Sequence, residues 1–240
     1  MTTRLECFLS NKWPANSPLR SNAISLGFAE SGFIAPQAYF RDGRVDMTDL
    51  FSAFDMLDAT IANWVPLCLN FEHNSWFTLD DGPISGAAYL RLQQFVSRAM
   101  HERYQRLIIN WGSPKSNHLL QFKASEVWSC AGIGAYWREG DDTGTWFWHA
   151  RRRLANASPF ALPTMLYVSP TVFPRSWRDP GVTMNNGQWN HVLNYCDEVR
   201  AADPTTMFSF WQNRDSDEAG FTDEYLLHRM TGMAERLGDD

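Results

Sequence analysis

The stretch WVPLCLNFEHNSW, residues 64–76, decides the predicted fold, because an apolar run ends abruptly there in polar and acidic side chains. Its first part, 65–71, is short and mostly aliphatic, which predicts a strand buried on both faces. Side chains alternate along a strand, so Asn70 and Glu72 leave it on the same side, at its carboxyl end. Ligands bind at that end in parallel α/β folds. The pattern therefore predicts a functional carboxylate at Glu72, with helix capping or an arginine ion pair as the alternative.

Predicted strands alternate with predicted helices from residue 65 onward. The strands cover 65–71, 106–111, 132–136, 164–169 and 206–211, and the helices that follow them cover 84–104, 117–129, 145–155, 186–201 and 222–237. Five consecutive strand–helix units indicate a parallel sheet with right-handed crossovers.

The first part of the chain, 1–62, is less regular. It holds predicted strands over 5–9, 23–28 and 37–40, a helix over 47–62, and an ordered loop over 13–22. The strands then total eight, which favours a compact or degenerate (β/α)8 TIM-type barrel over an open sheet. The chain shows no interdomain linker and no internal repeat, so we expect residues 1–240 to form a single domain.

Composition excludes several classes of function. The net charge is −6 and the pI is near 5.5, which argues against a nucleic-acid partner. No apolar run approaches membrane-spanning length, and the amino-terminal residues show no apolar signal core. We therefore expect no membrane partner and no signal peptide, hence a cytoplasmic protein or one released or assembled without a secretion signal. The four dispersed cysteines fit a reducing compartment.

Cofactor and metal motifs do not occur in the sequence. There is no Walker P-loop or complete dinucleotide fingerprint, and the six histidines lack metal-ligand spacing. We expect no cofactor and no metal, which leaves acid–base chemistry on carboxylates as the favoured catalytic class.

Aromatic residues are the compositional outlier, with eleven tryptophans and sixteen phenylalanines. Several of them fall at or just past predicted strand ends, where they either line a cleft or pack in the core. Rings in a cleft stack on the apolar faces of sugars. Together with polar residues at the same ends, they predict a carbohydrate ligand. The candidate binding residues are Trp76, Trp111, Trp137, Trp211 and Gln212.

Glycoside hydrolysis uses two carboxylates, or one acid with a neighbouring substrate group as the nucleophile. In the second mechanism an N-acetyl group attacks the anomeric carbon, and an Asp or Asn beside the acid orients that group. Asn70 and Glu72 meet this geometric requirement. The two-carboxylate alternative is a retaining mechanism that pairs Glu72 with Glu139 or Asp215.

The segment LCLNFE, residues 67–72, resembles the strand-four signature of barrel glycosidases that use substrate assistance. Chitinases and hyaluronidases carry Asp-x-Glu there, and one type of endo-β-N-acetylglucosaminidase carries Asn-x-Glu. The segment MLYVSP, residues 165–170, resembles a later hyaluronidase strand in which a tyrosine lines the site. The further aspartates of the chitinase signature are absent. The resemblance implies Glu72 as general acid/base, Asn70 as the acetamide-orienting residue, Tyr167 as a hydrogen-bond donor and Trp211 as a sugar platform.

A different class of function also fits these observations. A non-catalytic barrel that binds glycans, or that serves as a structural component of a larger assembly such as a virus particle, would share the aromatic abundance and the incomplete signature. An oligomer or larger assembly therefore stays open.

Overall fold

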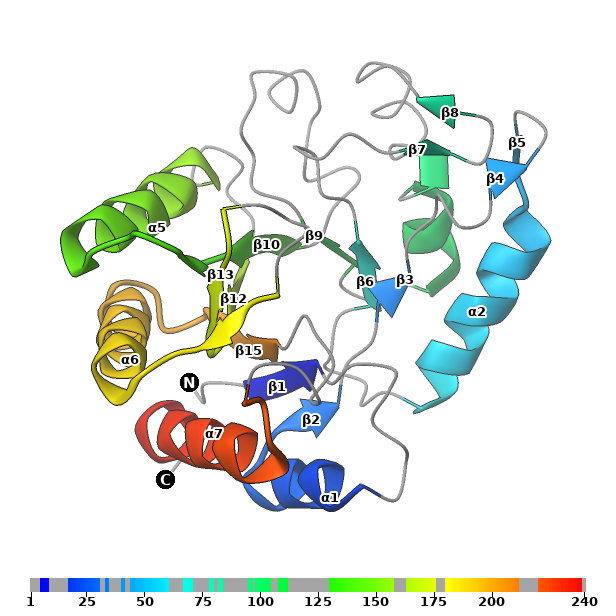
Figure 1. Ribbon diagram of the computed structural model, residues 1–240. Helices are drawn as coiled ribbons and strands as arrows, with labels where there is room; N and C mark the ends of the chain where they lie inside the picture. Colours follow the sequence, from blue (N-terminus) through cyan, green and yellow to red (C-terminus); the bar gives the residue numbers. More distant parts are fainter. Residues whose placement is uncertain are drawn as a thin grey trace. The chain divides into compact units, whose positions relative to one another are not determined.

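The computed structural model describes residues 5–8, 17–30, 33–34, 40–41, 44–60, 67–70, 78–79, 82–83, 95–96, 98–104, 108–111, 130–157, 163–175, 180–211 and 220–238 (Figure 1). The chain divides into two compact units. Unit 1 comprises Met1–Glu30, Gly134–Leu154 and Thr164–Asp240, and unit 2 comprises Ser31–Ile133 and Ala155–Pro163.

Unit 1 contains a parallel sheet. Its strands, within the described residues, follow the spatial order β2 (Ala29–Glu30), β1 (Leu5–Phe8), β15 (Met207–Trp211) and β12 (Thr164–Val168). Every neighbouring pair is parallel. All five residues of β15 are buried, as expected for a central parallel strand that is covered on both faces.

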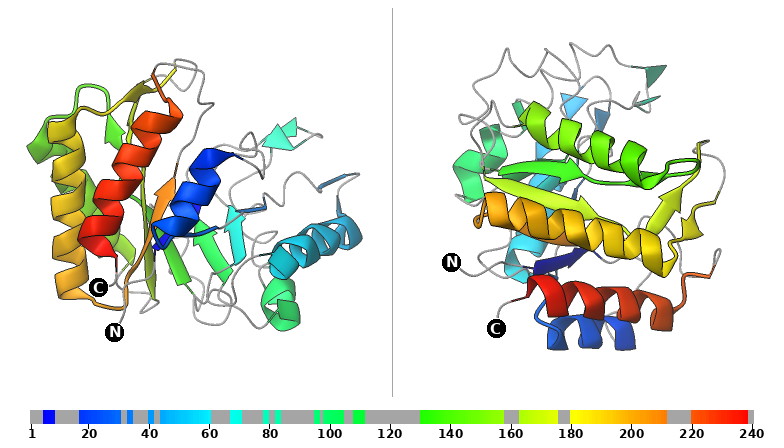
Figure 2. Two further views of the ribbon diagram at one scale, coloured as in Figure 1. Left: turned by 90° about the horizontal axis from the view of Figure 1, so that it is seen from below. Right: turned by 90° about the vertical axis from the view of Figure 1, so that its left-hand side faces the viewer.

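Helices cover one face of this sheet. They are α1 (Pro18–Ser25), α5 (Thr143–Ala157), α6 (Asn186–Ala202) and α7 (Asp223–Leu237), and α7 lies beside both α1 and α6 (Figure 2). The ring of Phe210 meets Trp189 of α6 edge to face at 6.0 Å. Because side chains alternate along β15, Ser209 and Trp211 lie on the opposite face.

A second, small sheet follows the carboxyl ends of the unit 1 strands. It consists of β11 (Trp137–Arg138), β13 (Thr171–Phe173) and β14 (Val182–Thr183). The parallel register places Trp137 beside Val172 and Arg138 beside Phe173. Trp137 stacks on Trp146 of α5, with ring centroids 5.2 Å apart and an interplanar angle of 17°. Arg138 and Phe173 therefore occupy the face of this sheet that does not pack on Trp146.

Unit 2 contains a second set of parallel strands. Their spatial order, among described residues, is β10 (Cys130–Gly134), β9 (Ile108–Trp111), β6 (Leu67–Asn70) and β3 (Phe33–Ile34). Two antiparallel hairpins accompany them, β4 (Phe40–Arg41) with β5 (Arg44–Val45) and β7 (Thr78–Leu79) with β8 (Gly82–Pro83). Among the described residues, β6 follows the parallel strands β1, β2 and β3 along the chain.

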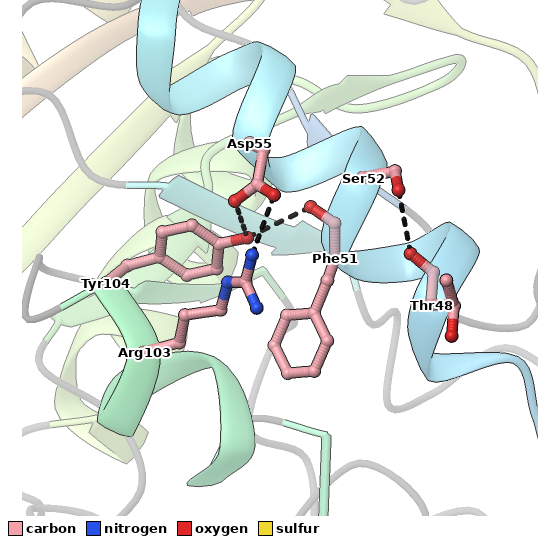
Figure 3. Close-up of polar contacts among 6 residues, drawn as sticks. All are labelled: Thr48, Phe51, Ser52, Asp55, Arg103 and Tyr104. Carbon is pink, nitrogen blue, oxygen red and sulfur yellow. Dashed lines mark hydrogen bonds and ion pairs between the residues drawn. The ribbon is translucent and has the colours of Figure 1, made fainter.

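Helix α2 (Met47–Thr60) packs on the helical residues 98–104 (Figure 3). Leu50 and Phe54 are fully buried on its inner face. At its rim, Arg103 Nη2 donates to Asp55 Oδ2 at 2.7 Å, and the Tyr104 hydroxyl donates to Asp55 Oδ1 at 2.8 Å. These contacts are partly solvent-exposed, so they orient the two helices more than they stabilise them.

The structure agrees with most of the predicted elements in the later part of the chain. The strands predicted over 65–71, 106–111, 132–136, 164–169 and 206–211 are β6, β9, β10, β12 and β15, and the helices predicted over 145–155, 186–201 and 222–237 are α5, α6 and α7. The helix predicted over 117–129 lies outside the described residues. The fold shown is a parallel α/β architecture, and the closed barrel and single domain stay predictions.

The strand predicted over 23–28 is wrong, and so is the predicted loop at residues 18–22, because α1 occupies Pro18–Ser25. Residues 13–16 of that loop lie outside the described residues. Ser17 caps this helix by accepting from the backbone N–H of Leu19 at 3.2 Å, and Pro18 takes the first helical position. A serine followed by a proline is a helix-start signal that outweighs the short apolar alternation after it. The nearby strand is β2 instead. Of the strand predicted over 37–40, Phe40 belongs to an antiparallel hairpin.

Candidate functional site

The predicted site residues divide between described and undescribed parts of the chain. Glu72, Trp76, Gln212 and Asp215 lie outside the described residues. Asn70 and Trp111 belong to unit 2, and the remaining residues belong to unit 1, namely Trp137, Glu139, Tyr167 and Trp211.

The carboxyl edge of the unit 2 strands brings two predicted residues together. Asn70, the last residue of β6, pairs in register with Trp111, the last residue of β9. Trp111 in turn pairs with Gly132 of β10. Neighbouring residues in register on parallel strands share a face, so Asn70, Trp111 and Gly132 form one row. Gly132 adds no side chain to this row. Glu72 follows Asn70 by two residues in the sequence.

The carboxyl edge of unit 1 carries a cluster of three aromatic rings. Trp211 ends β15, Phe173 ends β13, and Tyr136 lies between β10 and β11. The centroid of the Tyr136 ring is 5.0 Å from that of Phe173 and 5.2 Å from that of Trp211. Trp211 is 5% exposed, whereas Tyr136 and Phe173 are partly exposed. Trp211 therefore forms the inner part of the cluster.

One row below this cluster, the same face of the sheet is polar. Tyr167 of β12 is 3% exposed and pairs in register with Ser209 of β15. Ser209 is fully buried, and its hydroxyl has no hydrogen-bond partner within the described part of the chain. Glu6 occupies the neighbouring register position on β1. Polar positions in the interior of a parallel sheet are costly to maintain, which makes this row a candidate for ligand contact.

Trp137 and Glu139 lie close in sequence but in different surroundings. Trp137 is 3% exposed and stacked on Trp146, which corresponds to the packing alternative for this residue. Glu139 is exposed on a turn, and its Oε2 accepts from the backbone N–H of Arg175 at 3.5 Å. Its own backbone N–H donates to the Phe173 carbonyl at 2.7 Å. The turn at Glu139 is thus tied to the end of β13.

Charges of both signs act on Arg153 in unit 1, namely those of Arg138 and Asp141. Arg153 of α5 donates from Nη1 to the Gly134 carbonyl at 2.6 Å. Burial and, secondarily, the positive charge of Arg138 lower the pKa of the Arg153 guanidinium. The negative charge of Asp141 acts in the opposite direction on this pKa.

Among the residues that the structure describes, no group of three or more His, Cys, Asp and Glu side chains is arranged to hold a metal ion. No helix in the same ranges combines the length and the apolar character needed to cross a bilayer.

No protein-family model and no curated protein matches the chain. Among solved structures, a DUF72 family protein from Enterococcus faecalis is similar over 98% of both chains, with 11% identity and a TM-score of 0.52. Bee venom hyaluronidase in complex with a hyaluronic acid tetramer is similar over 98% of this chain and 85% of that chain, with 13% identity and a TM-score of 0.46. A Cellulomonas fimi endo-beta-1,4-mannanase double mutant matches 88% of this chain and 55% of that chain, with 15% identity and a TM-score of 0.48.

The likeness to the Enterococcus faecalis protein extends over nearly the whole of both chains and agrees with the parallel α/β fold. It shows the fold alone, because one such fold hosts many unrelated activities. Any functional conclusion has to come from the residues at the carboxyl edges of the strands.

Tyr136 and Phe173 are site candidates that the sequence did not single out. The signal that could have found them is that each follows a buried strand by two to five residues, the position used to select the four tryptophans. The contact between the two rings depends on the small sheet. Its strands β11 and β13 are only two and three residues long, too short for their alternation of apolar and polar residues to be recognised in the sequence.

Proposed function

We propose that this chain is a glycoside hydrolase that cleaves an N-acetylhexosamine-containing glycan, with Glu72 as the general acid/base. The observation that carries the proposal is the position of Asn70, which pairs in register with Trp111 and ends the fourth of the parallel strands that the structure describes along the chain. Catalytic residues sit at the carboxyl ends of strands in TIM-barrel-type folds. Glu72 follows within two residues of that end.

The proposed reaction has two steps. In the first, the Glu72 carboxyl protonates the glycosidic oxygen while the acetamide oxygen of the substrate attacks the anomeric carbon, so the glycosidic bond breaks as an intramolecular C–O bond forms. Asn70 orients the acetamide group and stabilises the charge that develops on it. In the second step, Glu72 removes a proton from water, and the resulting hydroxide opens the cyclic intermediate. The enzyme is regenerated, and neither step needs a cofactor or a metal ion.

The test is hydrolysis of chitooligosaccharides, hyaluronan and N-glycans by the wild type, Glu72→Gln and Asn70→Ala. We expect Glu72→Gln to lower the rate at least ~100-fold, because general acid catalysis typically contributes that much. Asn70→Ala should lower kcat more than it raises KM, since its interaction strengthens as charge develops. Glu235→Gln is the matched control, because Glu235 is an exposed carboxylate on α7, and Glu139→Gln tests the two-carboxylate alternative.

Each outcome assigns a different role to the chain. Cleavage that survives Glu72→Gln refutes the acid/base assignment. A large loss in Glu139→Gln instead favours the retaining mechanism with two carboxylates. An absence of cleavage across the panel, with glycan binding equal in the wild type and Glu72→Gln, refutes the hydrolase and favours the non-catalytic glycan-binding barrel.

A further inference from the structure

Two aromatic rings of unit 1, Tyr136 and Phe173, are partly exposed to solvent. Exposed large aromatic surface is costly in water unless something covers it. Both rings lie at the carboxyl edge of a parallel sheet, where ligands bind in this type of fold. Both also contact the buried ring of Trp211, at 5.2 Å from Tyr136 and 6.2 Å from Phe173 between centroids.

Trp211 fixes the plane of the outer ring. The Phe173 and Trp211 rings are nearly parallel, with an interplanar angle of 14°. Since Trp211 is 5% exposed, the surface that this cluster offers to a ligand belongs to Phe173 and Tyr136. Rings held in place before binding lose little conformational entropy when a ligand stacks on them.

The backbone around the cluster is built to hold these rings. A Cβ at position 134 would lie 2.4 Å from the Tyr136 ring, so glycine at that position is what allows the ring to lie over the end of β10. The backbone N–H of Ala135 donates to the Tyr167 carbonyl at 2.9 Å, and that of Glu139 donates to the Phe173 carbonyl at 2.7 Å. Tyr136 is therefore anchored on both sides along the chain.

A charged donor flanks the rings. Arg138 is exposed and in register with Phe173, on the same face of the small sheet. An apolar ring surface beside a group with several N–H donors matches a pyranose, whose faces carry C–H groups and whose edge carries hydroxyls. A purely apolar ligand would offer no hydrogen-bond acceptor to the Arg138 guanidinium.

We propose that Phe173 and Tyr136, backed by Trp211 and flanked by Arg138, form a stacking platform for one pyranose ring of a glycan. The glycan nature of the ligand rests on the proposed function, whereas the platform itself rests on the ring geometry. In this proposal the sugar contacts Tyr136 and Phe173, and the buried Trp211 supports those two rings without touching the sugar.

The experiment measures binding of tri-N-acetylchitotriose and of a hyaluronan tetrasaccharide by isothermal titration calorimetry. Phe173→Leu removes the ring and keeps an apolar side chain, and it should weaken binding of the preferred probe by about tenfold, the loss expected for a few tens of Å² of apolar contact. Phe173→Trp should restore binding. Trp148→Leu is the control, because Trp148 on α5 is another exposed aromatic residue, at 56% exposure.

Three results overturn the platform. The wild type binds neither probe, or Phe173→Leu binds like the wild type, or Trp148→Leu loses as much affinity as Phe173→Leu. Thermal unfolding of each variant shows that the fold is retained, and the Phe173→Trp rescue separates a ring contact from general loosening. Hydrolysis that needs Glu72 but not Phe173 keeps the proposed function and removes the platform. Binding that needs Phe173 in a chain without hydrolase activity keeps the platform and removes the hydrolase.

Discussion

Replacing Tyr195 by phenylalanine is expected to stabilise the protein, although most core substitutions destabilise. Tyr195 of α6 is 1% exposed, and its ring meets Trp146 and Phe147 edge to face at 5.7 and 5.5 Å. Its buried hydroxyl has no hydrogen-bond partner among the residues that the structure describes. An unpartnered buried hydroxyl costs about 1–3 kcal/mol, and phenylalanine keeps the ring contacts without it. We expect the free energy of unfolding to rise by about 1 kcal/mol.

The stability difference between Tyr195→Phe and the wild type should also depend on pH. Burial raises the pKa of Tyr195 above its ordinary value. The folded state then holds the phenolic proton at pH values where the unfolded state, with a pKa of about 10, has released it. Wild-type stability therefore falls as the pH rises above about 10, because the folded state binds more protons than the unfolded state. Phenylalanine does not ionise, so the advantage of Tyr195→Phe should grow above that pH.

The assay is urea unfolding at pH 8 and pH 10.5, with Tyr225→Phe as the matched control. The Tyr225 hydroxyl donates to the Pro170 carbonyl at 2.7 Å and lies 3.1 Å from the Met184 carbonyl. The same substitution should there lower the free energy of unfolding by about 1–2 kcal/mol. A Tyr195→Phe variant that is less stable than the wild type by about 1 kcal/mol would refute the reasoning, because its hydroxyl would then have a partner.

Three further predictions concern local structure and are checked by denaturant unfolding. Gly140→Ala and Gly27→Ala should each lower the free energy of unfolding by about 1–2 kcal/mol, because both have positive φ (81° and 88°) and the guanidinium near position 140 belongs to the exposed, flexible Arg175, which can move aside. Thr222→Ala removes the amino-terminal cap of α7 and should cost about 1 kcal/mol, with Thr222→Ser restoring it. Asp55→Asn should lower the unfolding midpoint slightly, and the difference should shrink in 1 M salt because the Arg103 pair is solvent-exposed (Figure 3).

The later part of the chain was predictable because its signals are local. Each buried strand there is a short apolar run, and each helix is long enough to show a 3.6-residue period or a cap, such as Thr222 before α7. In the first thirty residues, these signals do not occur together. Helix α1 is eight residues long and its apolar face is weak, so the helix start at Ser17 and Pro18 was the only strong signal.

The candidate site was only partly predictable from the sequence. The position of Asn70 at the carboxyl end of a strand follows from the apolar run before it, and β6 does end at Asn70. Such an apolar run does not reveal whether a tryptophan at a strand end is buried or exposed. Trp137 is buried because α5 presents Trp146 to it, and Trp211 is covered because Tyr136, between β10 and β11, and Phe173 of β13 pack against it. Such partners come from distant segments, so they leave no local pattern.

The stacking of Trp137 on Trp146 also has a consequence for the proposed platform. Trp137 and Arg138 are adjacent on a two-residue strand, so they project to opposite faces of the small sheet. A shift of one residue in the β11–β13 register would exchange those faces and turn Phe173 away from its flanking arginine. Two residues of backbone pairing hold such a register weakly, whereas a buried tryptophan pair holds it strongly. Trp146 never touches the ligand in this scheme, yet it determines which side chains the carboxyl edge of unit 1 presents.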